Sequence, residues 1–339
     1  MIIIYTIFLY FFSIYVIKKS IFFFNKYSIM DYPAERSNHI TPTPKGAGLI
    51  IIPIVAISTL IFFYFFLQPL NEWAIIFFLC FFLGIISFID DIKNLSIKSR
   101  LLLQTLIVGL SLLVYYEPVT TNLLSVPVSY ERYFPLINCF LFLFFLLSWV
   151  WIINLYNFMD GIDGLTALQV CTVAICVNFL SMIGYLNEED QIFSLILFSV
   201  YLAFYKFNKS PAKIFLGDVG SIPSGYLVGF IMFSCLLTNG VLLPIIIVNM
   251  YYILDSTSTL LIRIVKKENI LKAHSDHFYQ KMIRKGYSHH SVLRKIFFLF
   301  IFLFLLSFIS LKYHLISFAL ALVSTILSLI YFSVRSTNE

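Results

Sequence analysis

Aspartates stand where apolar segments of this chain end. Asp90 and Asp91 lie in "FIDDIK", Asp160 and Asp163 lie in "NFMDGIDGL", and Asp218 lies in "FLGDVGS". An ionisable group beside a bilayer is costly and by default indicates function. Clustered carboxylates repel one another, and a divalent cation relieves that repulsion. Because Mg²⁺ typically binds one or two carboxylates together with waters and substrate phosphates, these residues suggest a site for a phosphorylated substrate.

Glycines flank these acids. Gly161 and Gly164 follow the two aspartates of the second segment, and Gly217 and Gly220 surround the aspartate of the third. Glycine permits tight turns and a close approach of backbone to ligand, and backbone N–H groups at helix starts bind anions. Together with the acids, this pattern suggests a diphosphate substrate. Two other interpretations stay open, a solvated helix end and a calcium-type turn, although "DGIDG" lacks the further ligands of an EF-hand.

Other polar residues carry weaker signals. His274 and His277 are spaced i, i+3 and share a face if helical, but no third ligand follows at a spacing typical of zinc. Asp255 lies inside an apolar segment, where it is either a polar contact between helices or a catalytic group. The five cysteines form no CxxC pair, so they predict neither a disulfide framework nor a zinc site.

The elements that must position these residues are membrane helices. The chain has 339 residues, of which 60% are hydrophobic and 12% charged, with a mean hydropathy of +0.93. Soluble domains are about a quarter charged, and apolar runs here reach the ~20 residues that a helix needs to cross a bilayer. The sequence predicts an all-α, polytopic integral membrane protein with a single domain over residues 1–339. We expect about eleven spans, near 1–17, 48–67, 73–89, 100–117, 134–152, 164–185, 190–207, 220–237, 241–262, 295–312 and 313–334.

Charge predicts the orientation of these spans. Of the 23 Lys and Arg residues, 21 lie in the loops that follow odd-numbered spans or in the C-terminal tail. Short basic loops stay in the cytoplasm, so the N-terminus is expected outside and the C-terminus in the cytoplasm. The expected cytoplasmic loops lie near 18–47, 90–100, 153–164, 206–221 and 263–295. They contain the five aspartates that stand at the ends of apolar segments, and their basic residues also suit anionic lipid or a phosphorylated substrate.

Five segments resemble, in order, the motifs of the polyprenyl-phosphate N-acetylhexosamine-1-phosphate transferases. This family includes phospho-N-acetylmuramoyl-pentapeptide transferase and the enzymes that initiate O-antigen. The segments are "DYPAERSNHITPTPKGAG", "DDIKNLSIKSRLLLQ", "NLYNFMDGIDGL", "NKSPAKIFLGDVGS" and "HSDHFYQKMIRKGYSHHSV". The last is similar to the histidine loop of lipopolysaccharide-initiating members that use N-acetylated 6-deoxyhexoses, so the chain resembles the O-antigen-initiating members most.

The resemblance implies roles for individual residues. Asp218 matches a Mg²⁺ ligand, and Asn157 matches a position that contributes to the metal and substrate sites. Phe215 matches the aromatic residue that stacks on uracil, and Asp163 matches a residue of the uridine pocket with an expected catalytic role. Further catalytic or substrate-binding positions are expected at Lys45, Asp90, Asp91, Asp160, Asn208, His274 and His277.

Two positions depart from the resemblance. In the opening loop, Ala47 stands where glycine is common in the family. Similar members often carry arginine directly after the first histidine of the loop, and this chain has Ser275. Arg263, Lys266 or Lys272 is expected to supply the missing cation.

The implied reaction transfers an N-acetylated sugar 1-phosphate from a UDP-sugar to undecaprenyl phosphate and releases UMP. The resemblance implies Mg²⁺, with Mn²⁺ as a substitute, the cytoplasmic face of the bacterial inner membrane, a homodimer, and no nucleic-acid partner. Both direct attack by the lipid phosphate and a covalent route through Asp90 or Asp91 stay open. The alternative function is a transporter or lipid-carrier flippase with an acidic cytoplasmic gate. That alternative predicts midplane charges and paired broken helices, and only Asp255 fits it.

Overall fold

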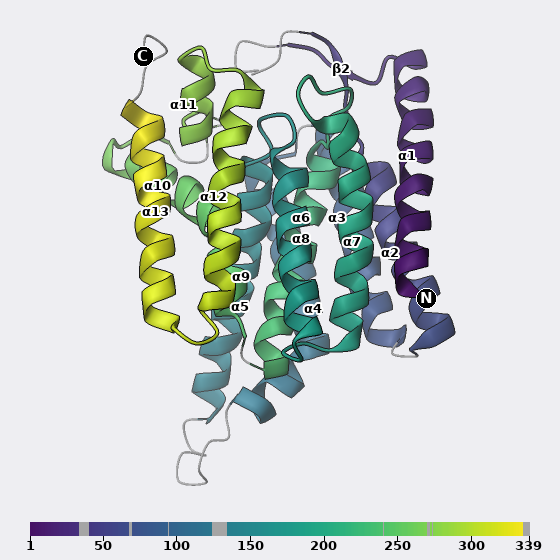
Figure 1. Cartoon of the computed structure of the whole chain (residues 1–339), viewed down its shortest axis with the longest axis vertical. Helices are drawn as coiled ribbons and strands as arrows, with labels where there is room; N and C mark the ends of the chain where they lie inside the picture. Colours follow the sequence, from purple (N-terminus) through teal and green to yellow (C-terminus); the bar gives the residue numbers. More distant parts are fainter. Residues whose placement is uncertain are drawn as a thin grey trace.

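Long helices make up nearly all of the described chain (Figure 1). The computed structural model describes residues 1–33, 41–67, 70–93, 95–123, 134–239, 241–269, 272 and 274–334. Parts of three predicted cytoplasmic loops, at 34–40, 94, 270–271 and 273, therefore lie outside the described residues. The helices are α1 (Ile2–Lys26), α2 (Gly48–Phe66), α3 (Leu70–Lys93), α4 (Ile97–Leu123), α5 (Phe134–Phe158), α6 (Leu165–Met182), α7 (Glu188–Asn208), α8 (Asp218–Asn239), α9 (Leu243–Val248), α10 (Met250–Val265), α11 (Phe278–Arg284), α12 (His289–Ile309) and α13 (His314–Val334).

The predicted all-α membrane fold is confirmed. Within the described residues, ten helices are long and apolar enough to cross a bilayer, namely all of those above except α9, α10 and α11. Helices suit this environment because each backbone N–H and C=O is bonded within its own segment. Two short antiparallel strands, β1 (Met30–Asp31) and β2 (Thr43–Pro44), pair with each other, and the hydropathy pattern did not predict them.

The predicted span 241–262 is not one helix. It is divided between α9 and α10, which meet at Asn249. Gln169 of α6 donates hydrogen bonds to the Val248 carbonyl (3.2 Å) and to Asn249 Oδ1 (3.0 Å), and Tyr156 of α5 donates to the same oxygen (2.8 Å). These side chains donate hydrogen bonds at the break, where unsatisfied backbone polar groups would otherwise be costly in lipid.

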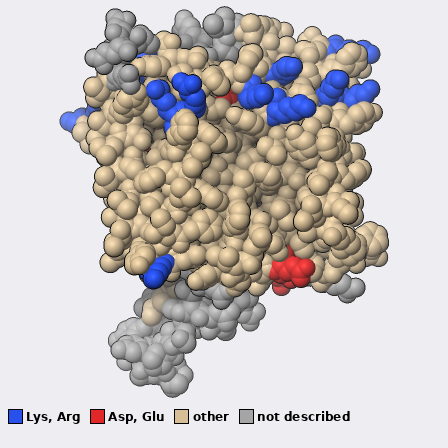
Figure 2. Space-filling model, in the orientation of Figure 1, with Lys and Arg blue, Asp and Glu red and all other residues tan. Residues whose placement is uncertain are grey.

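Together, α9 and α10 still return the chain across the molecule. In Figure 1, α8 runs from the upper face to the lower face, and α12 begins again at the upper face. The N-terminus lies toward the lower face and α13 ends at the upper one, in agreement with an odd number of crossings. Lys and Arg side chains gather along the upper face, and an acidic patch lies on the lower face (Figure 2). By the positive-inside rule, we expect the upper face to be cytoplasmic.

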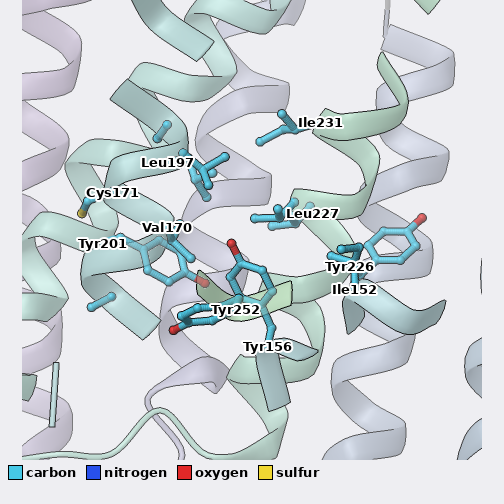
Figure 3. Packing of buried hydrophobic residues seen from close by; sticks show 14 of the residues in the cluster. Ile152, Tyr156, Val170, Cys171, Leu197, Tyr201, Tyr226, Leu227, Ile231 and Tyr252 are labelled. Carbon is cyan, nitrogen blue, oxygen red and sulfur yellow. The ribbon is translucent and has the colours of Figure 1, made fainter. Parts of the chain in front are cut away.

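A buried core of tyrosines and aliphatic side chains lies at the centre of the bundle. Figure 3 shows side chains from α5, α6, α7, α8 and α10 packed together. The rings of Tyr156 and Tyr252 lie 4.9 Å apart between centroids, and the hydroxyl of Tyr201 is hydrogen-bonded to Ser224. Because buried hydroxyls need partners, these bonds specify how the helices pack beneath the loops of the upper face.

We predict that Gln169→Leu destabilises the protein at the α9–α10 break. The change leaves the Val248 carbonyl without this donor and removes one of the two donors to Asn249, at a cost of about 1–3 kcal/mol for an unsatisfied buried group. The measurement is thermal unfolding of the purified protein in detergent. Ser181→Ala is the control because the Ser181 hydroxyl donates to the Val177 carbonyl of its own helix and joins no second helix among the described residues. Equal melting temperatures for the two variants would contradict the role assigned to Gln169.

Candidate active site

A polar pocket of about 230 Å³ lies at the upper ends of the helices. Segments far apart in the sequence supply its walls, which are formed by Asp31, Lys45, Asp160, Gly161, Ile162, Asp163, Asn208, Phe215, Leu216, Gly217, Asp218, Gln280 and His289. Six of these residues were predicted from the sequence: Lys45, Asp160, Asp163, Asn208, Phe215 and Asp218. The fold therefore brings the opening loop, the "DGIDG" turn and the "FLGDVGS" loop to one place.

Backbone hydrogen bonds join the opening loop to the loop before α8. The Phe215 N–H donates to the Pro44 carbonyl (2.8 Å), and the Gly46 N–H donates to the Phe215 carbonyl (3.1 Å). A Cβ built on Gly48 would lie 2.3 Å from the Gly220 Cα, so the starts of α2 and α8 approach at a distance that only glycine allows. This contact places the Lys45 side chain beside Asp218.

Two cations lie among the carboxylates. Lys45 Nζ lies 3.0 Å from Asp91 Oδ1. Arg100 Nη1 lies 3.0 Å from Asp90 Oδ2 and 4.0 Å from Asp218 Oδ2. Burial by itself would lower the pKa of Lys45, but the carboxylates of Asp218 and Asp91 outweigh that effect and raise it. Lys45 therefore stays positively charged at neutral pH and partly neutralises the acids around it.

The two adjacent aspartates have different surroundings. Asp90 is buried, and its Oδ1 accepts the Leu95 N–H (2.7 Å) while its Oδ2 accepts from Arg100. Both carboxylate oxygens of Asp90 therefore hold the start of α4 in place. The Asp91 side chain keeps 26% of its surface exposed beside Lys45. The catalytic roles assigned to the pair stay predictions, and Asp91 is the more accessible carboxylate.

Asp160 and Asp218 form the acidic part of the pocket. Burial raises the pKa of Asp160 to about 7, and the negative charge of Asp218 adds to this effect. Asn157 lies close by, since its amide donates to the Ser221 hydroxyl (3.1 Å) in the first turn of α8. A cation placed here would relieve the repulsion between the two carboxylates.

The donors present fit a cation that is shared with a ligand. Among the described residues, no group of three or more His, Cys, Asp or Glu side chains is placed to hold a metal ion without help. Mg²⁺ does not require such a cage, because it retains several waters and binds through one or two carboxylates and substrate phosphates. Asp218, with Asn157 and Asp160 nearby, provides that kind of donor set.

Asp163 and Asn208 join the α5–α6 turn to the α7–α8 loop. Asp163 Oδ1 lies 3.1 Å from His289 Nδ1, and its Oδ2 accepts the Ala212 N–H (3.1 Å). The Asn208 amide accepts from the Gly164 N–H (2.9 Å) and donates to the Ile214 carbonyl (2.9 Å). Both side chains line the pocket, and both also hold its shape.

The histidine loop is anchored from below by Asp255. The Asp255 side chain is fully buried, and its Oδ1 lies 3.1 Å from His277 Nδ1 and accepts the Phe278 N–H at 3.1 Å. The Tyr251 hydroxyl donates to the other oxygen (3.2 Å). Of the two interpretations left open for Asp255, the structure shows the polar contact, between α10 and the start of α11.

His274 and His277 do not line the pocket. His277 is 2% exposed, and the His274 ring stacks on it at 5.2 Å between centroids. Burial and the neighbouring His277 and Arg263 lower the pKa of His274 to about 4, so this ring is neutral at pH 7. From this region, Gln280 and His289 reach the pocket instead. The predicted catalytic roles of His274 and His277 stay predictions.

Comparison with known proteins identifies the family. Residues 73–236 match the family model described as glycosyl transferase family 4. This match places residues 73–236 in glycosyl transferase family 4. The matched region holds three of the five motifs and all of the predicted acidic residues, and the family predicted from the sequence is confirmed.

Individual relatives agree with this family. A probable undecaprenyl-phosphate N-acetylglucosaminyl 1-phosphate transferase of Bacillus subtilis is 27% identical over 301 residues, which cover 85% of this chain and 78% of the relative. A phospho-N-acetylmuramoyl-pentapeptide-transferase of Streptococcus pneumoniae is 31% identical over 231 residues (65% and 66%). The same kind of enzyme from Aquifex aeolicus is 33% identical over 220 residues (58% and 60%). The chain thus spans just under two thirds of the pneumococcal relative.

Sequence reasoning missed two family 4 site candidates, Arg100 and His289. Arg100 lies in the "DDIKNLSIKSRLLLQ" motif, and a cation at the start of an apolar helix ten residues after Asp90 is a signal for an ion pair. His289 begins α12 directly after its N-cap, Ser288. Nothing local in the sequence connects His289 to Asp163, which is 126 positions away.

Arg263, one of three cations expected to compensate for Ser275, is instead paired with Asp276 and Glu268.

We predict that Asp255→Ala loosens the histidine loop. The change removes the acceptor for His277, Phe278 and Tyr251, and each buried donor left unpaired costs about 1–3 kcal/mol. Hydrogen–deuterium exchange should rise several-fold across 274–284 and stay unchanged across α6. Tyr251→Phe, which removes only one donor, should show a smaller increase. Unchanged exchange in 274–284 of Asp255→Ala would show that another contact holds the loop.

Proposed function

We propose that this protein transfers an N-acetylated sugar 1-phosphate from a UDP-sugar to undecaprenyl phosphate and releases UMP. The observation that carries this proposal is the pocket in which Asp160 and Asp218 lie beside Lys45 at the end of the membrane helices. A water-soluble diphosphate and a membrane-bound phosphate can meet only at such a level. The names of the Bacillus and pneumococcal relatives support the same general chemistry.

The nucleotide half of the donor fits the part of the pocket around Phe215. This half-buried aromatic ring lines the pocket and offers a face on which uracil can stack. Asp163, held by Ala212 and His289, presents carboxylate oxygens that can accept a uracil or ribose donor. Asn208 keeps the two loops at the spacing that this arrangement needs.

The diphosphate requires positive charge. When one phosphate attacks another, like charges approach, so the barrier falls mainly through positioning and electrostatic stabilisation. Asp218 and Asn157 would hold Mg²⁺, or Mn²⁺ in its place, and the bound cation would neutralise the diphosphate and the leaving UMP. Lys45 and Arg100, now paired with carboxylates, would turn their charges toward the phosphate oxygens.

The acceptor phosphate needs little help from a base. A phosphomonoester has a second pKa of about 6, so the lipid phosphate is largely ionised near neutral pH. In our proposal, Asp91 orients or deprotonates it, and Asp90 holds Arg100 and the start of α4. A covalent route remains the alternative. Asp91 is then the better candidate nucleophile because both oxygens of Asp90 are already hydrogen-bonded.

The pathway and location are also part of the proposal. We place the reaction on the cytoplasmic face of the bacterial inner membrane, as the initiating step of lipopolysaccharide O-antigen or a related envelope glycan. The histidine-loop sequence favours an N-acetylated 6-deoxyhexose over N-acetylglucosamine. The enzyme is proposed to act as a homodimer.

One observation favours the transporter alternative, the broken helix α9–α10. A transporter of that kind needs a second broken helix, and the described residues contain none that matches it.

We predict that Asp218→Asn lowers UMP release by roughly a hundredfold or more, because the change removes the carboxylate proposed to hold the cation that would stabilise the developing phosphate charge. The assay mixes purified protein, Mg²⁺ and undecaprenyl phosphate with UDP-N-acetylglucosamine or UDP-linked N-acetylated 6-deoxyhexoses. Glu188→Gln, an exposed acid on the opposite face, is the matched control and should keep wild-type activity. Wild-type turnover by Asp218→Asn would refute its assignment, and no UMP from any sugar with the wild-type protein would refute the transferase proposal.

We predict that Phe215→Leu weakens UMP binding by about tenfold, because loss of a stacked base–aromatic contact costs roughly 1–3 kcal/mol. Isothermal titration of UMP into the detergent-solubilised protein measures this change. Phe298→Leu, at a ring that is 64% exposed on α12, should leave the affinity unchanged. Equal UMP affinities for the wild type and Phe215→Leu would move the base-binding site away from Phe215.

A further inference from the structure

A second cavity, of about 530 Å³, lies between α6, α7 and α12. Its walls are almost entirely apolar, with Leu168 and Ile175 from α6, Leu202 from α7, and Phe297 and Phe304 from α12. Leu202 and Phe297 are 37% and 40% exposed, so the groove opens on the flank that faces lipid. Its volume falls within the roughly 300–1,000 Å³ typical of small-molecule sites. We call it the flank groove.

Two cationic or protonatable side chains stand at the upper end of the flank groove. His290 and Arg294 are one turn apart at the start of α12, and both line the groove. Neither has an ion pair or hydrogen bond with any residue that the structure describes. Lys295, the next residue, is different, because its Nζ lies 3.1 Å from the Tyr331 hydroxyl. This end of α12 belongs to the upper face, where basic side chains gather (Figures 1 and 2).

We propose that the flank groove binds one anionic phospholipid of the bilayer leaflet on the basic face. An acyl chain occupies the apolar groove, and the lipid phosphate lies against Arg294 and His290. Basic pockets between transmembrane helices on the cytoplasmic side are typical sites for anionic head groups. An unpaired guanidinium above a lipid-facing apolar channel matches both halves of such a molecule.

The occupant is a bilayer phospholipid and not the lipid substrate of the proposed reaction. The flank groove and the polar pocket share no lining residue. Tyr205 and Leu293, which line the groove, pack against Gly164 at the back of the "DGIDG" turn and separate the two spaces. A phosphate at Arg294 is therefore separated by this wall from the pocket that contains Asp218.

The bound lipid nevertheless acts on the pocket through α12. His290 follows His289, which contacts Asp163 on the other side of the wall. A lipid phosphate at His290 and Arg294 would steady the first turn of α12 and, with it, the contact between His289 and Asp163. The lipid is thus a stabilising ligand of the fold, whatever reaction the pocket performs.

Native mass spectrometry of the purified full-length protein tests the proposal. The protein in detergent is mixed with equal amounts of phosphatidylglycerol and phosphatidylcholine that carry the same acyl chains. We expect one phosphatidylglycerol to be retained preferentially by the wild type, and about fivefold less of it by Arg294→Gln, the loss expected for one basic residue near a lipid surface. Lys295→Gln removes the same charge from the same turn and should retain the lipid like the wild type.

A second variant tests the apolar half of the site. Leu202→Trp places a larger ring in the groove and should reduce retention of phosphatidylglycerol while the melting temperature without added lipid stays within a few degrees of wild type. If the variant does not fold, Ile175→Phe, in the part of the wall that α6 supplies, provides the same test. Retention unchanged in a folded groove-filling variant would overturn the placement of the acyl chain.

Three further outcomes would overturn the proposal. Equal retention of the two lipids by the wild type would mean that the groove does not select an anionic head group. An equal loss in Arg294→Gln and Lys295→Gln would mean that the basic face attracts anionic lipid without a specific site. Displacement of phosphatidylglycerol by an equimolar amount of undecaprenyl phosphate would assign the groove to the lipid substrate. None of these readouts depends on transferase activity, so failure of the proposed function would not change their interpretation.

Discussion

The pocket depends on holding several carboxylates together at the edge of a low-dielectric bundle. Like charges at this depth repel strongly, because both water and salt screen them poorly there. The fold offsets the repulsion with cations from other segments: Lys45 beside Asp91, and Arg100 between Asp90 and Asp218. These cations come from the opening loop and from the start of α4. The position of the acids therefore requires that both segments be folded against the ends of α3 and α8.

The same requirement for polar partners explains the irregular backbone of the bundle. The break at Asn249 is stable because Gln169 and Tyr156 supply hydrogen bonds from other helices. One helix further along, Asp255 binds the first turn of α11 and so connects a transmembrane segment to a surface loop. In both places, buried polar side chains form the hydrogen bonds that stabilise a departure from continuous helix. These bonds also determine where along the chain the departure occurs.

The core and the loops have different structural roles. Aromatic and aliphatic side chains of five helices form the packed centre (Figure 3), where buried hydroxyls such as that of Tyr226, 2.6 Å from Ser111, have partners. The loops above it are tied to one another by short backbone bonds and by the Asn208 amide. Such a scaffold holds the site residues in place before any ligand binds, which is the condition for electrostatic stabilisation of developing charge.

Hydropathy determined most of this architecture from the sequence alone, because a bilayer leaves a long apolar segment no alternative to a helix. Spacing along the chain, with the basic loops, also placed Asp90, Asp160 and Asp218 at one face. Only the tertiary structure decided that span 241–262 breaks, since the side chains that satisfy its backbone come from α5 and α6. It likewise decided the partners of Asp255, Arg100 and His289. Contacts between residues many positions apart leave no local pattern, because they arise from how the helices pack and not from the composition of any one of them.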